Sequence, residues 1–290
     1  MKLTIATCQF PVDSDIRKNL KWIQNQMRTA KKGGAHIVHF SETCLAGCAG
    51  LEFESFEGFD WDLQRQCIHE VMDLAKRLQI WVIVGSNHQL SDNHKPLNSL
   101  YVINDCGQLV DRYDKRFCTG NVNELEGDLE YYSPGDHPVI FKIRGVVCGL
   151  AICHEMRYPE LYREYKRQNV QLVFHSYHNS FSKEKLHRVG NPWGIVVPAI
   201  MQAYAATNYM WISATNTSTP ETAWASFFVS PEGFIRGKLK NNRPGVLITT
   251  IDPKNYPLDP LKAWHDRALS GIYYSGTLVK DKRSKQRQIL

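Results

Sequence analysis

The chain has 290 residues, of which 43% are hydrophobic and 22% are charged, a composition typical of a soluble globular protein. No run of eighteen apolar residues occurs, so no membrane span is expected, and the opening MKLTIATCQF is interpreted as a strand, not a signal peptide. The net charge of +6 is compatible with nucleic-acid binding. However, the tail from Lys280 to Arg287 supplies four of those six charges, so the rest is nearly neutral and no nucleic-acid partner is expected.

The eight cysteines follow no disulfide framework. Cys44 and Cys48 are four residues apart, but no second Cys or His doublet accompanies them at zinc spacing. We therefore expect reduced thiols, a cytoplasmic location and no metal site.

Hydrophobic periodicity predicts strands and helices in alternation through the first half of the chain. Apolar residues recur at helical spacing from Ile16 to Ala30 and stop at Gly33-Gly34. A second amphipathic pattern ends near Leu78. Two stretches, 46–61 and 116–137, lack a regular pattern and are interpreted as loops. Strands are predicted at 3–10, 36–40, 80–84, 98–104 and 108–114.

The second half continues this mixture of hairpins and strand–helix units. Helices are predicted at 161–168 and 192–208, and strands at 139–143, 146–152, 170–176, 210–214, 224–230 and 246–251. Roughly twelve strands favour an α/β fold with two packed mixed sheets flanked by helices over one open sheet. We expect one domain over residues 1–257 and a C-terminal extension over residues 258–290 that is basic at its end.

Three residues with reactive side chains follow predicted strands. Cys153 follows the strand 146–152, Glu42 follows 36–40, and Lys115 follows 108–114. Each alone has an ordinary explanation as a buried thiol, a capping carboxylate or a solvated lysine. Together they suit acyl transfer, with a thiol nucleophile, a carboxylate base and a cation for the oxyanion. A Cys–His arrangement is the rival, and its candidates are His154, His175 and His178.

These residues lie in segments that resemble the carbon–nitrogen hydrolases of the nitrilase superfamily. Phe40-Ser41-Glu42 resembles the strand that carries the family's catalytic glutamate, and Tyr113 to Arg116 resembles its lysine segment. The run from Cys148 to Cys153, followed by Arg157 to Leu161, is similar to its nucleophile motif. Residues 202–208, Ser226 and the 231–233 turn resemble a later helix and hairpin, so the resemblance covers residues 3–252.

The resemblance implies an αββα sandwich built into homodimers or higher homo-oligomers, with no cofactor and no metal. It implies that Glu42 is the general base, that Lys115 stabilises the tetrahedral intermediate, and that Cys153 forms a thioester. The backbone N–H of His154 would complete the oxyanion hole. The expected substrate is a small linear amide or carbamoyl compound, and nitrile hydrolysis is less expected.

Two positions depart from the family pattern. His154-Glu155 stands where many members have Tyr-Asp, so Glu155 is expected to affect substrate preference. The family also has a second glutamate before the Pro134-Gly135 turn, and Glu126 is favoured for it over Glu124, Glu130 and Asp128. The expected pocket residues after the strand ending near His175 are Tyr177, Asn179, Trp193 and Trp224. The alternative function is a catalytically altered member of the fold that acts as a binding or scaffold protein.

Overall fold

The computed structural model describes residues 2–91, 93–121, 123–124, 126–179, 190–254 and 259–288. The chain divides into two compact units, residues 1–256 and residues 257–290. The domain boundary that the sequence predicts, between residues 257 and 258, lies outside the described residues.

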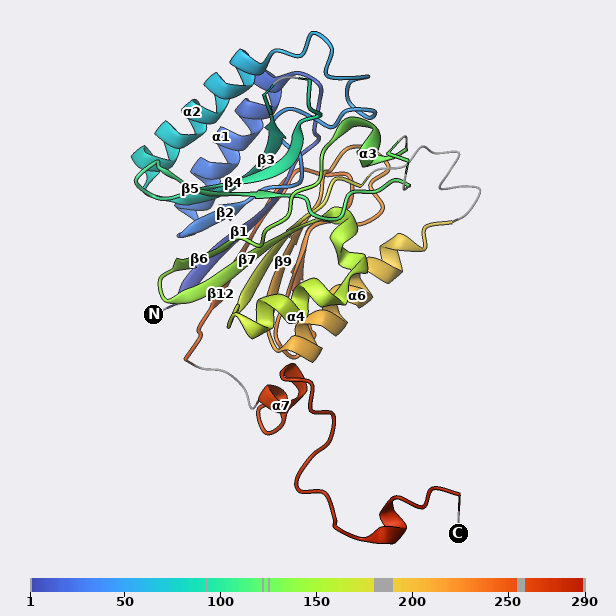
Figure 1. Ribbon diagram of the computed structural model, residues 1–290. Helices are drawn as coiled ribbons and strands as arrows, with labels where there is room; N and C mark the ends of the chain where they lie inside the picture. Colours follow the sequence, from blue (N-terminus) through green and yellow to red (C-terminus); the bar gives the residue numbers. More distant parts are fainter. Residues whose placement is uncertain are drawn as a thin grey trace. The chain divides into compact units, whose positions relative to one another are not determined.

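The described part of the first unit contains two mixed sheets of six strands each (Figure 1). In spatial order, the first sheet consists of β12 (Gly245–Ile251), β1 (Leu3–Gln9), β2 (Ile37–His39), β3 (Trp81–His88), β4 (Leu97–Ile103) and β5 (Leu109–Asp114). The second consists of β11 (Ile235–Lys238), β10 (Phe227–Val229), β9 (Trp211–Thr215), β8 (Leu172–Ser176), β7 (Val146–Ile152) and β6 (Ile140–Ile143).

Helices cover the outer face of each sheet. The first sheet packs against α1 (Ile16–Lys32) and α2 (Trp61–Leu78), and the second against α4 (Pro159–Arg167) and α6 (Trp193–Asn208). The shorter elements are α3 (Asp128–Tyr131), the 3-10 helix η1 (Cys153–Arg157), and, in the second unit, α7 (His265–Leu269) and η2 (Lys282–Ser284). This arrangement confirms the predicted αββα sandwich.

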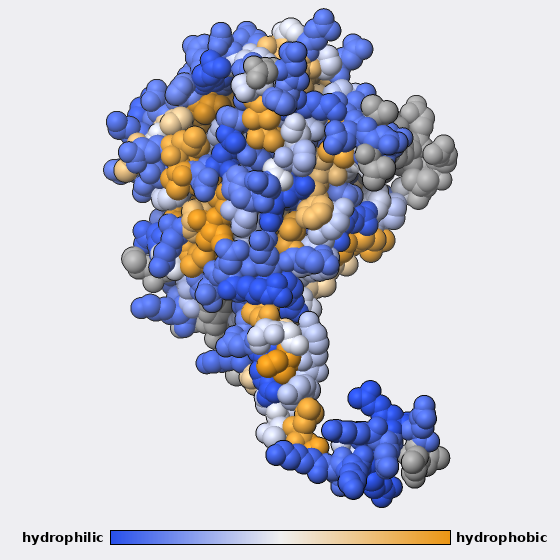
Figure 2. Space-filling view, viewed as in Figure 1, coloured by the Kyte–Doolittle hydropathy of each residue, from blue (hydrophilic) through white to orange (hydrophobic). Residues whose placement is uncertain are grey.

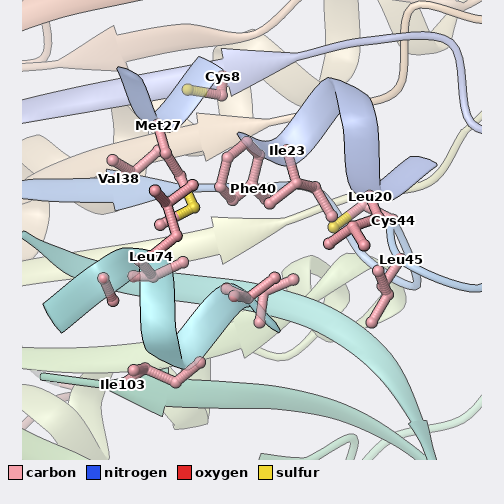
Figure 3. Packing of buried hydrophobic residues seen from close by; sticks show 14 of the residues in the cluster. Cys8, Leu20, Ile23, Met27, Val38, Phe40, Cys44, Leu45, Leu74 and Ile103 are labelled. Atoms are coloured by element: carbon pink, nitrogen blue, oxygen red, sulfur yellow. The ribbon is translucent and has the colours of Figure 1, made fainter. Parts of the chain in front are cut away.

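Side-chain alternation along the strands explains why both faces of each sheet are buried. On β1, Leu3 and Ile5 belong to the core between the sheets, whereas Ala6 and Cys8 face the helices α1 and α2. Because successive side chains of a strand point to opposite faces, one apolar strand supplies two cores. Figure 3 shows the outer core of the first sheet, where Met27, Val38 and Leu74 meet.

Some elements differ from their predicted extents. β3 continues past Gly85 to His88, and β10 is only three residues long. The strand β11 was not predicted, because its mostly exposed residues show no apolar alternation. The short helix α3 lies in a stretch interpreted as a loop.

The surface of the sandwich is mostly polar on the face seen in Figure 2, where apolar residues occur in separate patches. In the second unit, no described residue from 259 to 288 is buried. None of the described helices combines the length and the apolar character that a membrane span requires.

Candidate active site

Glu42 lies three residues past the end of the short strand β2, in a turn that passes over Gly85 in the middle of β3. A Cβ atom at Gly85 would lie 2.3 Å from the Ser41 carbonyl oxygen, so glycine is needed for this crossing. The Glu42 side chain is buried, and its Oε1 accepts hydrogen bonds from Lys115 Nζ and Asn98 Nδ2, both at 2.8 Å. Its Oε2 accepts from the backbone N–H of His178 at 2.9 Å. These donors fix the carboxylate.

Lys115 follows β5, and its buried ammonium contacts two carboxylates. Nζ lies 2.8 Å from Glu42 Oε1 and 2.7 Å from Asp128 Oδ2. Burial alone would lower the pKa of Lys115, but Asp128 and Glu42 raise it well above its usual value. Lys115 therefore carries a fixed positive charge in the interior of the site.

Asp128 begins α3 and is bonded to the loop that precedes it. Its Oδ2 accepts from the backbone N–H of Thr119 at 2.9 Å, and its own N–H donates to Thr119 Oγ1 at 2.9 Å. Burial raises the pKa of Asp128, but Lys115 and Thr119 outweigh this and lower it below its usual value. Glu126, which we expected here, is exposed, and the carboxylate on Lys115 comes from Asp128.

Cys153 lies at the end of β7, at the first position of η1. Its φ of +43° falls in the left-handed region, which costs a non-glycine residue free energy. The part-buried thiol has a pKa well above its usual value because of burial and the Glu42 carboxylate, while Lys115 acts in the opposite direction. The thiol is therefore neutral at rest, and its reaction needs a base.

The three candidate histidines contact other partners. His175 Nε2 lies 3.2 Å from the Cys153 carbonyl oxygen and Nδ1 lies 2.6 Å from Tyr162 Oη, while burial lowers the His175 pKa to about 3. The His178 ring pairs with Glu52 at 2.9 Å, and the His154 ring lies 3.4 Å from Tyr158 Oη. Among the described contacts, the carboxylate of Glu42 is therefore the better candidate base.

The expected pocket residues lie in different surroundings. Tyr177 and Trp224 are fully buried and form an edge-to-face pair with ring centroids 5.2 Å apart. Asn179 is part-buried, and its Oδ1 has no hydrogen-bond partner among the residues that the structure describes. The Trp193 ring packs against the Arg157 guanidinium at 4.3 Å. Only Asn179 of these four offers a free buried acceptor.

Glu155 is fully buried, and both of its oxygens are bonded within the protein. Both oxygens are thus engaged within the protein, and the predicted effect of Glu155 on substrate preference stays a prediction.

Sequence reasoning missed two residues of the site. Asn98 on β4 holds Glu42, and its only signal is an amide within a buried strand. Glu52 pairs with His178 across 126 positions of sequence, and no local pattern indicates such a contact. Within the described ranges, no group of three or more His, Cys, Asp or Glu side chains is arranged to hold a metal ion.

The fold and site define the class: an αββα sandwich in which a buried Glu–Lys pair lies close enough to a strand-end cysteine to shift the pKa of its thiol. A family model for carbon-nitrogen hydrolases matches residues 4–257. The chain belongs to the carbon-nitrogen hydrolase family, as the motifs had indicated.

The curated relatives are distant and include amidases. The deaminated glutathione amidase of Yersinia enterocolitica is 25% identical over 58% of this chain and 60% of its own length. The chain therefore covers less than two thirds of that relative. An omega-amidase of Bos taurus is also 25% identical, over 81% of this chain and 83% of its own length.

Solved structures show the same fold. A cysteine-to-alanine mutant of the amidase from Nesterenkonia sp. AN1, in complex with butyramide, has a TM-score of 0.74 and 18% identity, covering 93% of this chain and 96% of that one. In another structure of that amidase, with the same scores and coverage, the active-site cysteine carries the acetamide moiety of fluoroacetamide.

Proposed function

We propose that this protein hydrolyses a non-peptide carbon–nitrogen bond in a small linear amide or carbamoyl compound, through a thioester on Cys153. Glu42 is the general base, Lys115 stabilises the oxyanion, and Asp128 takes the place of the family's second glutamate. The observation that carries the proposal is the buried ammonium of Lys115, which lies 2.8 Å from Glu42 and lowers the pKa of the Cys153 thiol that burial raises.

In the first half of the reaction, Glu42 accepts the thiol proton as Sγ attacks the carbonyl carbon. The negative charge that develops on the carbonyl oxygen is stabilised by Lys115 Nζ and the backbone N–H of His154. The carbon–nitrogen bond then breaks, and the proton held by Glu42 passes to the leaving nitrogen, so ammonia or an amine departs and a thioester remains.

In the second half, Glu42 accepts a proton from a water molecule that attacks the thioester. The second tetrahedral intermediate is stabilised in the same way. Its collapse breaks the carbon–sulfur bond, and the sulfur regains a proton from Glu42 as the acid leaves. One carboxylate serves both halves because it returns to its ionised form each time.

The substrate class rests on two considerations. The relatives' names refer to amides, and the related Nesterenkonia amidase binds butyramide. Among the described residues, Lys115 lies between the carboxylates of Glu42 and Asp128, so the site supplies one positive charge for an oxyanion, while the two carboxylates disfavour a strongly anionic reacting centre. A neutral acyl carbon is therefore the favoured target.

The test is to incubate the protein with a panel of short linear amides and N-carbamoyl amines, measuring ammonia or amine release and the intact mass. Turnover together with an acyl mass on Cys153 is expected. Cys153→Ala should abolish both, while Cys118→Ala, a thiol whose Sγ lies 3.8 Å from the Lys115 carbonyl oxygen, should leave both unchanged.

Hydrolysis retained in Cys153→Ala would contradict the proposal. If fluoroacetamide labelled Cys153 no faster than the other seven cysteines, the alternative of a binding or scaffold protein would be favoured instead.

All eight cysteines are free in the structure, which supports a reducing, cytoplasmic location. A homodimer is proposed from the family resemblance, and light scattering on the purified chain tests it.

A further inference from the structure

The carboxylate of Glu155 accepts four hydrogen bonds in the interior of the protein. Oε2 accepts from the Ile152 N–H at 2.6 Å and from the Tyr113 hydroxyl at 2.7 Å. Oε1 accepts from the Arg116 N–H at 2.6 Å and from the Phe117 N–H at 3.3 Å. A carboxylate has about four lone-pair sites. The acceptor capacity of Glu155 is therefore used up by the protein, which leaves none for a substrate.

The four donors belong to the two chain segments that carry the catalytic candidates. Ile152 directly precedes Cys153 at the end of β7, in the second sheet. Arg116 directly follows Lys115 at the end of β5, in the first sheet. β5 and β7 share no hydrogen-bonded ladder, because each belongs to a different sheet. Glu155 is thus bonded to both segments across the interface between the sheets.

The bonds favour the ionised form of this side chain, because three of the donors are backbone N–H groups, which cannot accept a proton from a neutral carboxylic acid. Burial raises the pKa of Glu155 above its usual value, and the bonds from Ile152, Tyr113 and Arg116 and the charge of Lys115 offset only part of that shift. A glutamine would keep only one accepting oxygen and would turn its NH₂ group toward a pair of donors.

We propose that Glu155 is a positioning residue that sets the separation between the Lys115 ammonium and the Cys153 thiol by tying together the main chain beside each. The role rests on the proposed function of these two groups. Glu155 itself touches neither the thiol nor the substrate. Because a shift of about 1 Å in a reacting group can cost about 100-fold in rate, such a tie controls the chemical step more than substrate binding.

The experiment compares Glu155→Gln with Glu164→Gln as a matched control. Glu164 binds the same Arg116, since its Oε2 lies 2.7 Å from Arg116 Nη1, but among the described contacts its carboxylate bonds only that side chain, and it is part-exposed. Two readouts are used. One is the rate of Cys153 alkylation by iodoacetamide against pH, followed by peptide mass spectrometry, and the other is kcat and KM on an amide of the panel.

In Glu155→Gln we expect a Cys153 alkylation rate lower by about 10-fold or more, an altered pH profile, and kcat lower by about 100-fold with KM within about threefold. Glu155→Asp should recover part of the rate, and Glu164→Gln should resemble wild type. Near-UV circular dichroism checks the fold. Wild-type alkylation and kcat in a folded Glu155→Gln would overturn the proposal.

If Glu155→Gln does not fold, Tyr113→Phe removes one donor and leaves the charge. It should lower alkylation in the same direction by a smaller factor, and an unchanged alkylation rate and pH profile in this variant would overturn the positioning role. Alkylation needs no substrate. A wild-type chain that hydrolyses no amide, but whose Cys153 labelling still depends on Glu155, would defeat the proposed function and support the positioning role.

Discussion

The Oδ2 atom of Asp128 lies 2.7 Å from Lys115 Nζ, so the lysine of the site is held by a carboxylate from the loop that follows it as well as by Glu42. Two anions around one cation keep Lys115 charged despite its burial. An ammonium held in this way is ready to receive the charge of an oxyanion without reorganising.

Replacing Asp128 by Asn removes the charge and keeps the shape. The amide oxygen can still accept from Thr119, so the loop is retained, but the raised pKa of Lys115 falls and its orientation loosens. We expect kcat to fall by about 100-fold. The exposed Glu126→Gln is the control and should resemble wild type in steady-state kinetics. Equal kcat values for the two variants would remove Asp128 from the site.

The predictable part of this site follows from strand patterns. Cys153, Glu42 and Lys115 each follow a strand that the sequence predicts, and the carboxyl ends of strands gather functional groups. Asp128 was harder to choose, because residues 116–137 have no periodicity that fixes which acid faces inward. The contacts of Glu155 could not be predicted from the sequence, because they join segments of two different sheets and no local sequence pattern indicates them.

Gly85→Ala tests how the turn of Glu42 is accommodated. The new Cβ would lie 2.3 Å from the Ser41 carbonyl oxygen and 2.6 Å from the Thr43 nitrogen, so the turn must move. We expect a loss of about 1–3 kcal/mol in the free energy of unfolding and a loss of most amidase activity. Gly34→Ala is the control, because Gly34 has a φ of +75° and a Cβ atom built there would have no neighbouring atom within 4 Å. It should lower the free energy of unfolding by about 1 kcal/mol through its backbone conformation and keep full activity. Urea unfolding and steady-state kinetics of both variants test this prediction, and full activity in Gly85→Ala would contradict it.

His175 should stay neutral throughout the working range of the protein. Burial lowers its pKa from 6.5 to about 3, and its Nε2 lies against the Cys153 carbonyl oxygen. Because the unfolded chain binds the proton more readily, stability is lost as the pH falls below about 6.5, by up to about 1.4 kcal/mol per pH unit. Nuclear magnetic resonance of the His175 ring should show no titration between pH 5 and 8. A titration in that interval would show that the ring is not held in the observed contacts.

The buried pair of His178 and Glu52 also makes stability depend on pH. For His178 the dependence is opposite to that of His175, because its contribution is lost as the pH rises. Burial lowers the pKa of His178, but Glu52 and Glu42 outweigh burial and the repulsion from Lys115 and raise it above 6.5. For Glu52, burial raises the pKa, and the His178 charge outweighs this and lowers it below 4.5. The His178 contribution is fully present below its unfolded pKa and is lost as the pH rises through the raised value. The Glu52 contribution is present above its unfolded pKa and is lost as the pH falls through the lowered value.

The stabilisation from this pair is therefore greatest between about pH 4.5 and 6.5. Glu52→Gln should reduce the free energy of unfolding by about 3 kcal/mol near pH 5.5, and the difference from wild type should shrink as the pH rises through the raised pKa of His178, because both chains then hold a neutral His178. Glu57→Gln, an exposed acid in the same loop, should show almost no difference at any pH. The measurement is urea unfolding of the three chains from pH 4.5 to 9. If the difference in the free energy of unfolding between wild type and Glu52→Gln stayed constant over this range, Glu52 would not be the group that keeps His178 charged.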